Sequence, residues 1–434
     1  MKKIAVVGGG ITGLTCAYKL ASAGYKVILL EAEKEVGGLA GVIKIDNFYL
    51  EKYYHHFFRS DKEALKLLQE LSLKLNWLPS QVGIWLGGKA YKFSTPKDLL
   101  KFSPFSLRDK WKFGLGVIKA RFIKEWLPLE EKTSQEWLTE IMGDRAYKII
   151  WEPLLRSKFG SVYSNISASW IWGKIKLRGS SRSSCTQQEE LGYLEGSLVR
   201  LLDKLVDKIK SNGGEVKTNW EVKEISKVED KFVLTSNNEK LSDINKVIVT
   251  TSPAILSRKA PFLPSEYKKQ LESISYQGVI CMLIETDTSL SSIYWLNIAE
   301  ENFPFGGIIE QTNFIHPDNY GGRKFLYISR YISTSDEMWE KSATELLDLF
   351  LPYLKEINPN FNRKNILNYY LFKDAYAQPV VEKFYSRKIL PFSTPFDGLY
   401  LVSMCQIYPQ DRGVNYAVEL AGKFLKDFTS QIKQ

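Results

Sequence analysis

KIAVVGGGITG, residues 3–13, joins a short apolar run to glycines in the spacing G-x-G-x-x-G. The apolar, mostly β-branched residues 3–7 predict a buried parallel strand. The three glycines play different roles, since Gly8 permits a tight turn, Gly10 lets backbone N–H groups approach a pyrophosphate, and Gly13 lets the following helix pack closely on the strand. The N-terminus of that helix adds partial positive charge for the phosphates.

The residues that follow keep the order of a βαβ unit. Apolar residues recur at helical spacing over 14–21, and a second apolar run over 26–30 ends in Glu31. A carboxylate at this distance can accept hydrogen bonds from an adenosine ribose. Glycine-rich turns alone are common, but strand, helix, second strand and acid together predict dinucleotide binding. The alternative is a doubly wound sheet with an empty site.

A pair of glycines, Gly37 and Gly38, follows Glu31. Here the sequence resembles the FAD enzymes of the amine oxidase, protoporphyrinogen oxidase and phytoene desaturase group, in which such a pair follows the ribose-binding acid. The resemblance implies FAD in place of NAD. In that group an Arg often comes next and helps to hold the flavin side, whereas this chain has Leu39. That contact is therefore missing or supplied from elsewhere.

The resemblance also implies an α/β fold, in which an α+β substrate domain is inserted into a Rossmann-type FAD-binding domain, as in amine oxidase-like two-domain flavoproteins. Local patterns agree, with a helical run at 198–209 and a last helix at about 415–430. Strand-like runs lie at 215–218, 220–225, 246–250, 323–332 and 398–402. We expect the FAD-binding domain to comprise residues 1–75, 190–260 and 390–434, with a mainly helical insert at 76–189 and a mixed sheet at 261–389.

In this fold the last helix points its N-terminus at the ribityl chain and pyrophosphate of the flavin, and a backbone near Val222 meets the adenine. The family more often has a Gly-Asp pair after the last strand, where this chain has Ser403 and Met404. For Arg412 the alternative is a pair with a surface carboxylate. The predicted FAD-binding residues are Gly8, Gly10, Ile11, Thr12, Gly13, Glu31, Ala32, Gly37, Gly38, Leu39, Ala40, Val222, Arg412, Gly413, Val414, Asn415 and Ala417.

Two of the three histidines, His55 and His56, stand together in an aromatic stretch. UDP-galactopyranose mutases carry an H-x-F-H-T motif beside the flavin, and this motif can be laid on the chain from His55, although Phe58 replaces its second histidine. An imidazole near the isoalloxazine could tune N5 or donate a proton at neutral pH. The alternative is a pair of packed histidines that caps an aromatic core.

Residues 151–160, which include Lys158, resemble a segment shared by the mutases and the protoporphyrinogen oxidase relatives. Further cations follow, of which Arg182 is the last. Cations that converge on a cleft would suit an anionic substrate such as a carboxylate or a diphosphate, and a solvated face is the alternative. The predicted catalytic residues are His55, His56, Lys158 and Arg182.

The chain carries 59 Lys and Arg against 49 Asp and Glu, a net charge of +10, but no basic run or zinc-finger motif that predicts nucleic-acid binding. Four scattered cysteines and three histidines offer no metal site. No apolar run approaches the ~18 residues of a membrane span, and no secretory signal is present, so we expect a cytoplasmic protein. Residues 99–126 interleave aromatic and basic side chains. This pattern fits a helix on the inner face of the membrane or the mouth of a tunnel for a lipid-like substrate. Core packing with snorkelling lysines explains the same pattern and is slightly preferred.

Three functions remain open. The first is an FAD-dependent oxidoreductase with hydride-type transfer to flavin N5 from an amine, a porphyrinogen or a polyene. The second is a mutase-like flavoenzyme that acts on a nucleotide- or lipid-linked sugar, and the third is a non-enzymatic FAD-binding protein. The sequence has no Ser-His-Asp order and no paired carboxylates in a motif, so the cofactor must carry the hard step. Phe58 favours net oxidation over sugar isomerisation.

Overall fold

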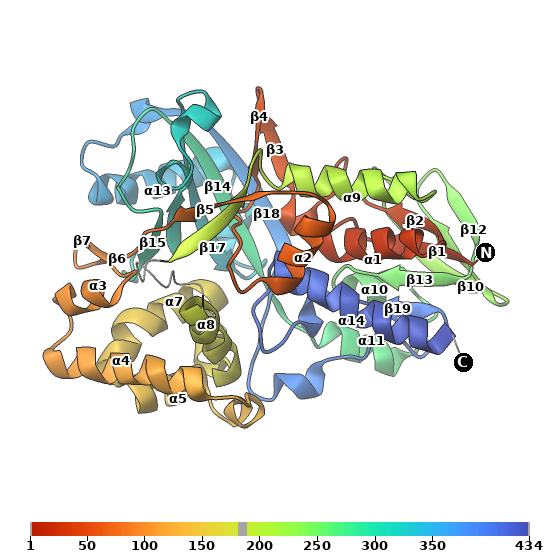
Figure 1. Ribbon diagram of the computed structural model, residues 1–434, viewed down its shortest axis with the longest axis horizontal. Coiled ribbons are helices and arrows are strands. Elements are labelled where there is room, and N and C mark those ends of the chain that lie inside the picture. The colour runs from red at the N-terminus through yellow and green to blue at the C-terminus, as the bar shows by residue number, and fades with distance from the viewer. Residues whose placement is uncertain (1, 181–188, 433–434) are drawn as a thin grey trace.

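The computed structural model describes residues 2–180 and 189–432. Its elements form two units: one contains a parallel sheet and lies at the end of the molecule that holds the N- and C-termini, and the other contains a mixed sheet and a group of helices (Figure 1). Within the described residues, no helix combines the length and the apolar character that crossing a bilayer requires.

The parallel sheet has five strands in the order β19-β13-β1-β2-β9. Their bounds are Leu399–Leu401, Lys246–Val249, Lys3–Val7, Lys26–Leu30 and Glu215–Lys217. Alternate residues of β1 enter two different cores, as expected of a strand that is buried on both faces. Ile4 and Val6 pack with α1 (Ile11–Ser22), α9 (Val199–Ser211) and α14 (Val414–Ile432).

The opposite face of this sheet is covered by a small antiparallel sheet and two helices. Ala5 and Val7 pack there with apolar residues of these elements. The elements are β10 (Glu224–Val228), β11 (Lys231–Thr235), β12 (Lys240–Ile244), α10 (Pro253–Lys259) and α11 (Ser265–Glu272). The sequence pattern predicts a strand over 220–225, but β10 begins only at Glu224. The residues before it run past the end of β2, where the Trp220 N–H donates to the Glu31 carbonyl oxygen at 2.8 Å.

The second unit is built on a seven-stranded sheet in the order β18-β14-β17-β16-β15-β6-β7. Helix α13 (Ala343–Ile357) packs on one face. The other face packs against the β3–β4 hairpin (Val42–Ile45 and Phe48–Glu51) and the chain that follows it. The strand bounds are Ile366–Pro379, Tyr276–Thr286, Lys324–Ile332, Gly307–Glu310, Trp295–Ile298, Val82–Leu86 and Lys89–Lys92.

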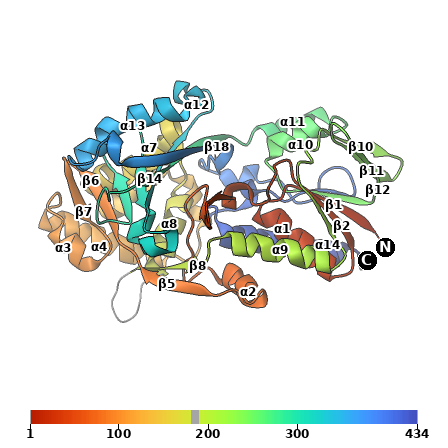
Figure 2. The ribbon, with the colours of Figure 1, turned by 90° about the horizontal axis from the view of Figure 1, so that it is seen from above.

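Helices form the rest of the second unit and share a core of aromatic residues. The segment 76–189 contains most of these helices and also supplies β6 and β7 to the large sheet. Strand β5 (Leu75–Pro79) pairs with β8 (Glu190–Leu194). The longer helices are α3 (Pro96–Lys101), α4 (Leu107–Phe122), α5 (Ser134–Met142), α7 (Glu152–Phe159) and α8 (Ala168–Ser180). Figure 2 shows this group at the end of the molecule opposite to the chain termini, and α2 (Lys62–Glu70) beside α14.

Candidate functional site

The glycines of residues 8–13 form the turn between β1 and α1. Gly8 has φ +104°, a backbone conformation that L side chains rarely adopt, and a Cβ on Gly13 would stand 1.9 Å from the Gly8 carbonyl oxygen. At Gly10, by contrast, the nearest atom to a Cβ would be 4.0 Å away. Gly10 caps α1, and no side chain of the described residues accepts a hydrogen bond from the N–H groups of the first turn. The turn is therefore closed toward the sheet and open toward the helix N-terminus, where a pyrophosphate would lie.

Gly37 and Gly38 meet this turn from the other side. The Gly37 N–H donates to the Gly9 carbonyl oxygen at 2.8 Å, and a Cβ on Gly38 would lie 3.5 Å from the Gly10 Cα. Both glycines have positive φ, +132° and +54°. Leu39 and Ala40 follow in a short 3-10 turn. The two glycine motifs thus form one cradle around the start of α1.

Glu31 ends β2 beside the cradle, with its side chain 9% exposed. One carboxylate oxygen accepts from the Gly9 N–H at 2.6 Å and the other from the Glu33 N–H at 2.9 Å. Each oxygen keeps a lone pair. The carboxylate is therefore fixed in position and still able to accept from a ribose hydroxyl. Val222 is buried near it, in the stretch that leads into β10.

Two side-chain hydroxyls follow β13 on the side of the cradle. The hydroxyls of Thr251 and Ser252, just after β13, are buried and have no hydrogen-bond partner in the part of the chain that the structure describes. Thr251 lies close enough to the turn that a Cβ on Gly8 would come within 3.1 Å of its methyl group. Buried polar groups are rarely left unpaired in a folded protein. The open space at Gly10, the unpaired hydroxyls and the fixed Glu31 carboxylate fit FAD at this place.

Helix α14 brings a second N-terminus to the same side of the molecule. Asn415 is buried, and its side-chain oxygen accepts from the backbone N–H groups of Glu63 and Ala64 at 3.0 and 3.1 Å. The start of α14 is thereby tied to the start of α2. A Cβ on Gly413 would meet nothing within 4 Å, so the entry to α14 is open as well.

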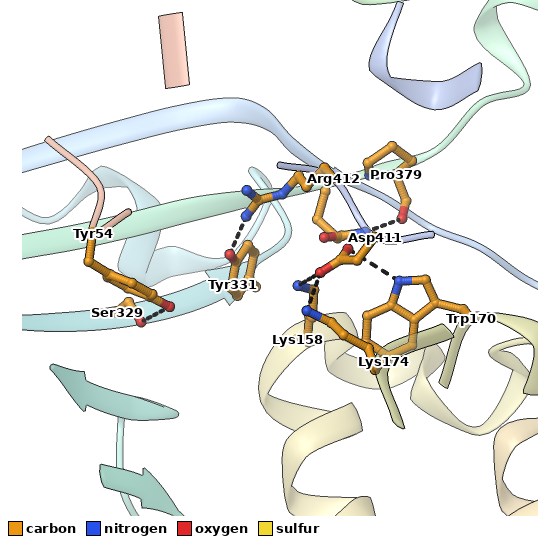
Figure 3. Close-up of polar contacts among 10 residues, drawn as sticks. Tyr54, Lys158, Trp170, Lys174, Ser329, Tyr331, Pro379, Asp411 and Arg412 are labelled. Atoms are coloured by element: carbon orange, nitrogen blue, oxygen red, sulfur yellow. Dashed lines mark hydrogen bonds and ion pairs between the residues drawn. The ribbon is translucent and has the colours of Figure 1, made fainter. Parts of the chain in front are cut away.

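Arg412, just before α14, lies between the two units (Figure 3). Its guanidinium donates to the Tyr331 hydroxyl on β17 and stacks 5.4 Å from the centre of that ring. Its Nε is buried and has no partner in the described part of the chain. The predicted alternative, a pair with a surface carboxylate, does not occur within the described residues. Tyr54 and Asp374 lie within electrostatic reach of the guanidinium.

Asp411, the residue before Arg412, anchors this part of the loop through ion pairs. Its carboxylate pairs with Lys158 of α7 at 2.9 Å and with Lys174 of α8 at 2.5 Å, and accepts from the Trp170 Nε1 at 3.2 Å (Figure 3). The side chain of Asp411 is 6% exposed, and the two lysines hold the pKa of its carboxyl well below the usual range. Lys158 and a second cation of the helical insert, Lys174, thus converge on this acid.

His55 lies at the same junction, and Arg412 acts on it electrostatically. Its Nδ1 is 2.5 Å from the Tyr53 carbonyl oxygen. A carbonyl only accepts, so Nδ1 carries the proton in the neutral ring and Nε2 presents a lone pair. Burial lowers the pKa of His55 to about 4, so the ring is neutral at pH 7.

His56 faces the large sheet. Its Nδ1 lies 3.4 Å from the Tyr294 hydroxyl, and its ring makes edge contacts with Phe58 and Trp295. This is the packed aromatic setting that the sequence offers as the alternative for the pair. Arg182, the fourth predicted catalytic residue, lies outside the described residues.

A cavity of about 590 Å³ opens on the large sheet beside Tyr331. Arg330, Arg156 and Gln277 line it. The Nε of each arginine and the side-chain oxygen of Gln277 are buried and have no hydrogen-bond partner within residues 2–180 and 189–432. Arg156 is otherwise held by Glu152 and Glu301. The walls of the cavity thus combine cationic, acidic and amide side chains.

Sequence reasoning did not single out Tyr331, Tyr54 or Asp411. Tyr331 belongs to the alternating pattern of β17, which predicts a strand but not which side chain meets Arg412. Asp411 meets Lys158 across 253 residues, and no local spacing records such a contact. The order Asp-Arg-Gly before the last helix was the available signal.

The chain is similar in sequence to known flavin-dependent enzymes. The chain is 25% identical to the flavin-containing amine oxidase A of the dog over 305 residues, which cover 65% of the chain and 56% of that protein. It is 24% identical to a 15-cis-phytoene desaturase of Glycine max, with 85% of the chain and 69% of that protein covered. The chain thus spans little more than half the length of the amine oxidases it matches.

The fold is also that of solved structures. An oxidoreductase from Methanosarcina mazei superposes with a TM-score of 0.76 at 18% identity, over 98% of this chain and 100% of the other. This likeness confirms the predicted two-domain flavoprotein fold. The family model of flavin-containing amine oxidoreductases matches residues 11–404. The chain belongs to that family, and its cofactor is FAD.

Proposed function

We propose that the protein is an FAD-dependent oxidoreductase that removes a hydride equivalent from an organic substrate. When bound, FAD supplies the hydride acceptor, flavin N5. The observation that carries the proposal is the gathering of Tyr331, Arg412 and His55 at the boundary between the two units, beside the N-terminus of α14. A cofactor in the glycine cradle that extends along this boundary would bring its ring among these side chains.

We assign proton uptake to His55. The Tyr53 carbonyl holds the ring through Nδ1, and the Nε2 lone pair is left to accept a proton that the substrate loses. A ring that is neutral at pH 7 is in the right protonation state for this step. His56 holds the aromatic wall in this proposal and does not exchange protons with the substrate.

Arg412 is the group that binds and orients. Its unpaired Nε can donate to an anionic group of the cofactor or of the substrate. Lys158 acts through Asp411 as a positioning residue, because its ammonium group is bonded to that carboxylate. For Arg182 a role in substrate binding stays a prediction.

The charges at this boundary favour some substrates over others. The three cations Arg412, Lys158 and Lys174 outnumber the two acids near them, Asp411 and Asp374, so a protonated amine would be repelled. A neutral polyene, or a molecule with carboxylates such as a porphyrinogen, fits better. The cavity beside Tyr331 does not add to this preference, because its walls carry both cationic and acidic side chains: Lys148, Arg156 and Arg330, and Glu152, Glu300, Glu301 and Asp336.

Anaerobic mixing of the FAD-loaded protein with porphyrinogens, polyenes and amines tests the proposal. We expect the flavin absorbance to bleach in proportion to one of the first two classes. Turnover of a nucleotide- or lipid-linked sugar only after external reduction, with the flavin left reduced, would identify a mutase-like enzyme. An FAD-loaded protein that is inert in both experiments would indicate a non-enzymatic FAD-binding protein.

A further inference from the structure

The outer face of α4 carries an exposed row of large apolar side chains. Nine large hydrophobic side chains are exposed in the described part of the chain, and seven of them lie between residues 100 and 127. Five are on α4, with exposed fractions between 38% and 82%. These five, the apolar stripe, are Leu107, Trp111, Leu115, Ile118 and Phe122.

The spacing of the stripe places it on a single face. At about 100° per residue, its five members fall within an arc of about 80°. The opposite face of α4 is already docked, through buried Phe113, Gly116 and Ala120. A Cβ on Gly116 would stand 2.4 Å from the Met142 Cγ, and the Trp172 Nε1 donates to the Ala120 carbonyl oxygen. A surface helix normally needs one apolar face, so the second is not explained by the core.

Basic side chains border the stripe on both flanks. Helical geometry puts Arg108, Lys112 and Lys119 along one edge, and Lys110 and Arg121 along the other. Residues 96–126 contain eight Lys and Arg and three Asp and Glu, a net charge of +5, which is half of the charge of the whole chain.

Two of the three acids in residues 96–126 already bond to other groups. Asp98 and Asp109 are bonded in the capping boxes of α3 and α4, and Asp109 lies 3.7 Å from Arg145. An apolar stripe with cationic edges is the pattern of a helix that lies in the interface of an anionic bilayer, with Lys and Arg reaching to the headgroups.

We propose that the apolar stripe of α4 docks the protein on an anionic lipid bilayer, with the helix axis parallel to the membrane plane. The stripe is about 24 Å long at 1.5 Å per residue. A second copy of this chain is a poorer partner, because face-to-face contact would oppose two surfaces of the same positive charge. Helix α4 lies at the far end from the chain termini in both views, so the FAD-binding unit would stand clear of the bilayer (Figures 1 and 2).

Flotation of the FAD-loaded protein with vesicles tests this proposal. We expect binding to phosphatidylcholine vesicles that contain phosphatidylglycerol, and binding that is roughly tenfold weaker, or more, to pure phosphatidylcholine or at high salt. The triple variant Leu107→Ser, Trp111→Ser, Phe122→Ser should lose roughly 100-fold or more in affinity for the anionic vesicles. Its unchanged FAD absorbance would show that the fold is intact.

Matched variants separate the stripe from general surface properties. Val228→Ser with Leu367→Ser removes the two exposed apolar side chains outside residues 100–127 and should leave binding unchanged. Arg108→Glu with Lys112→Glu and Lys119→Glu should abolish binding, whereas charge reversal at Lys355, Lys364 and Lys426 should reduce it far less. The proposal is overturned if the wild type does not float with anionic vesicles at low salt. It is equally overturned if both sets of variants behave alike, or if the stripe proves to mediate a dimer in solution.

Discussion

Gly10 and Gly13 stand three residues apart in the same turn, yet their surroundings differ. A Cβ at Gly13 would collide with the Gly8 carbonyl oxygen at 1.9 Å, whereas a Cβ at Gly10 would have no atom nearer than 4.0 Å. The φ of Gly10 is −70°, which any residue adopts. The fold therefore needs Gly13 for packing, and we propose that the space in front of Gly10 receives a bound molecule.

This difference predicts that alanine at Gly10 weakens FAD binding, whereas alanine at Gly13 lowers the stability of the fold. Gly10→Ala should leave the free energy of unfolding of the FAD-free protein almost unchanged and weaken FAD binding roughly 10–100-fold, because the methyl group would occupy the pyrophosphate position. Gly13→Ala should lower the free energy of unfolding by about 1–3 kcal/mol. Urea denaturation and flavin titration measure the two effects. Gly114→Ala in α4 is the control, because a Cβ there would meet nothing within 4 Å, and it should change neither FAD binding nor the fold. Normal FAD binding by Gly10→Ala would contradict the assignment.

His55 gives the stability of the protein a defined dependence on pH. Burial lowers its pKa from 6.5 to about 4 in the fold, so the unfolded chain takes up the proton first as the pH falls. The contribution of the neutral ring is present in full above pH 6.5 and is lost as the pH falls toward 4. We expect the difference in free energy of unfolding between wild type and His55→Asn to be smaller at pH 5 than at pH 7 by about 2 kcal/mol. A difference that is the same at both pH values would show that the His55 side chain is not buried.

At the scale of elements, Asp411 joins three of them. It lies in the loop before α14 and bonds to Lys158 of α7 and Lys174 of α8. The helical insert is thereby attached to the segment that presents Arg412 and the N-terminus of α14. Because this carboxylate is almost fully buried and doubly paired, its loss would leave two ammonium groups without their partner.

We expect Asp411→Asn to lower the free energy of unfolding by about 3–5 kcal/mol and to weaken FAD binding, because the loop that carries Arg412 would lose its anchor. Asp397→Asn is the matched control. Its carboxylate pairs with Lys246 but is 90% exposed, so its loss should cost no more than about 1 kcal/mol. Thermal unfolding of both variants with and without FAD measures this. Equal small effects would show that the Asp411 pairs do not hold the elements together.

For the whole molecule, the sequence predicts contiguous features well and long-range contacts poorly. Residues 3–31 contain strand, turn, helix, strand and acid in an unbroken run, so each part limits the next, and β1 and β2 have the expected bounds. Tyr331 meets Arg412 across 81 residues, and Lys158 meets Asp411 across 253. Such pairs depend on how the two units pack, which no local pattern encodes. The aromatic residues of 99–126 divide for the same reason, since Phe102, Phe105 and Phe113 are buried while Trp111 and Phe122 are exposed.

We place the reaction where the two units meet, with His55 beside the flavin. The anaerobic rate of flavin reduction, by the substrate class that bleaches the wild type, tests this placement when it is measured in His55→Ala and in His316→Ala. His316 is exposed and pairs with Asp318 on the outside of the second unit, so it serves as the matched control. We expect His55→Ala to retain FAD and to be reduced roughly 100-fold more slowly, and His316→Ala to match the wild type. Reduction of His55→Ala at the wild-type rate with full FAD content would contradict this placement.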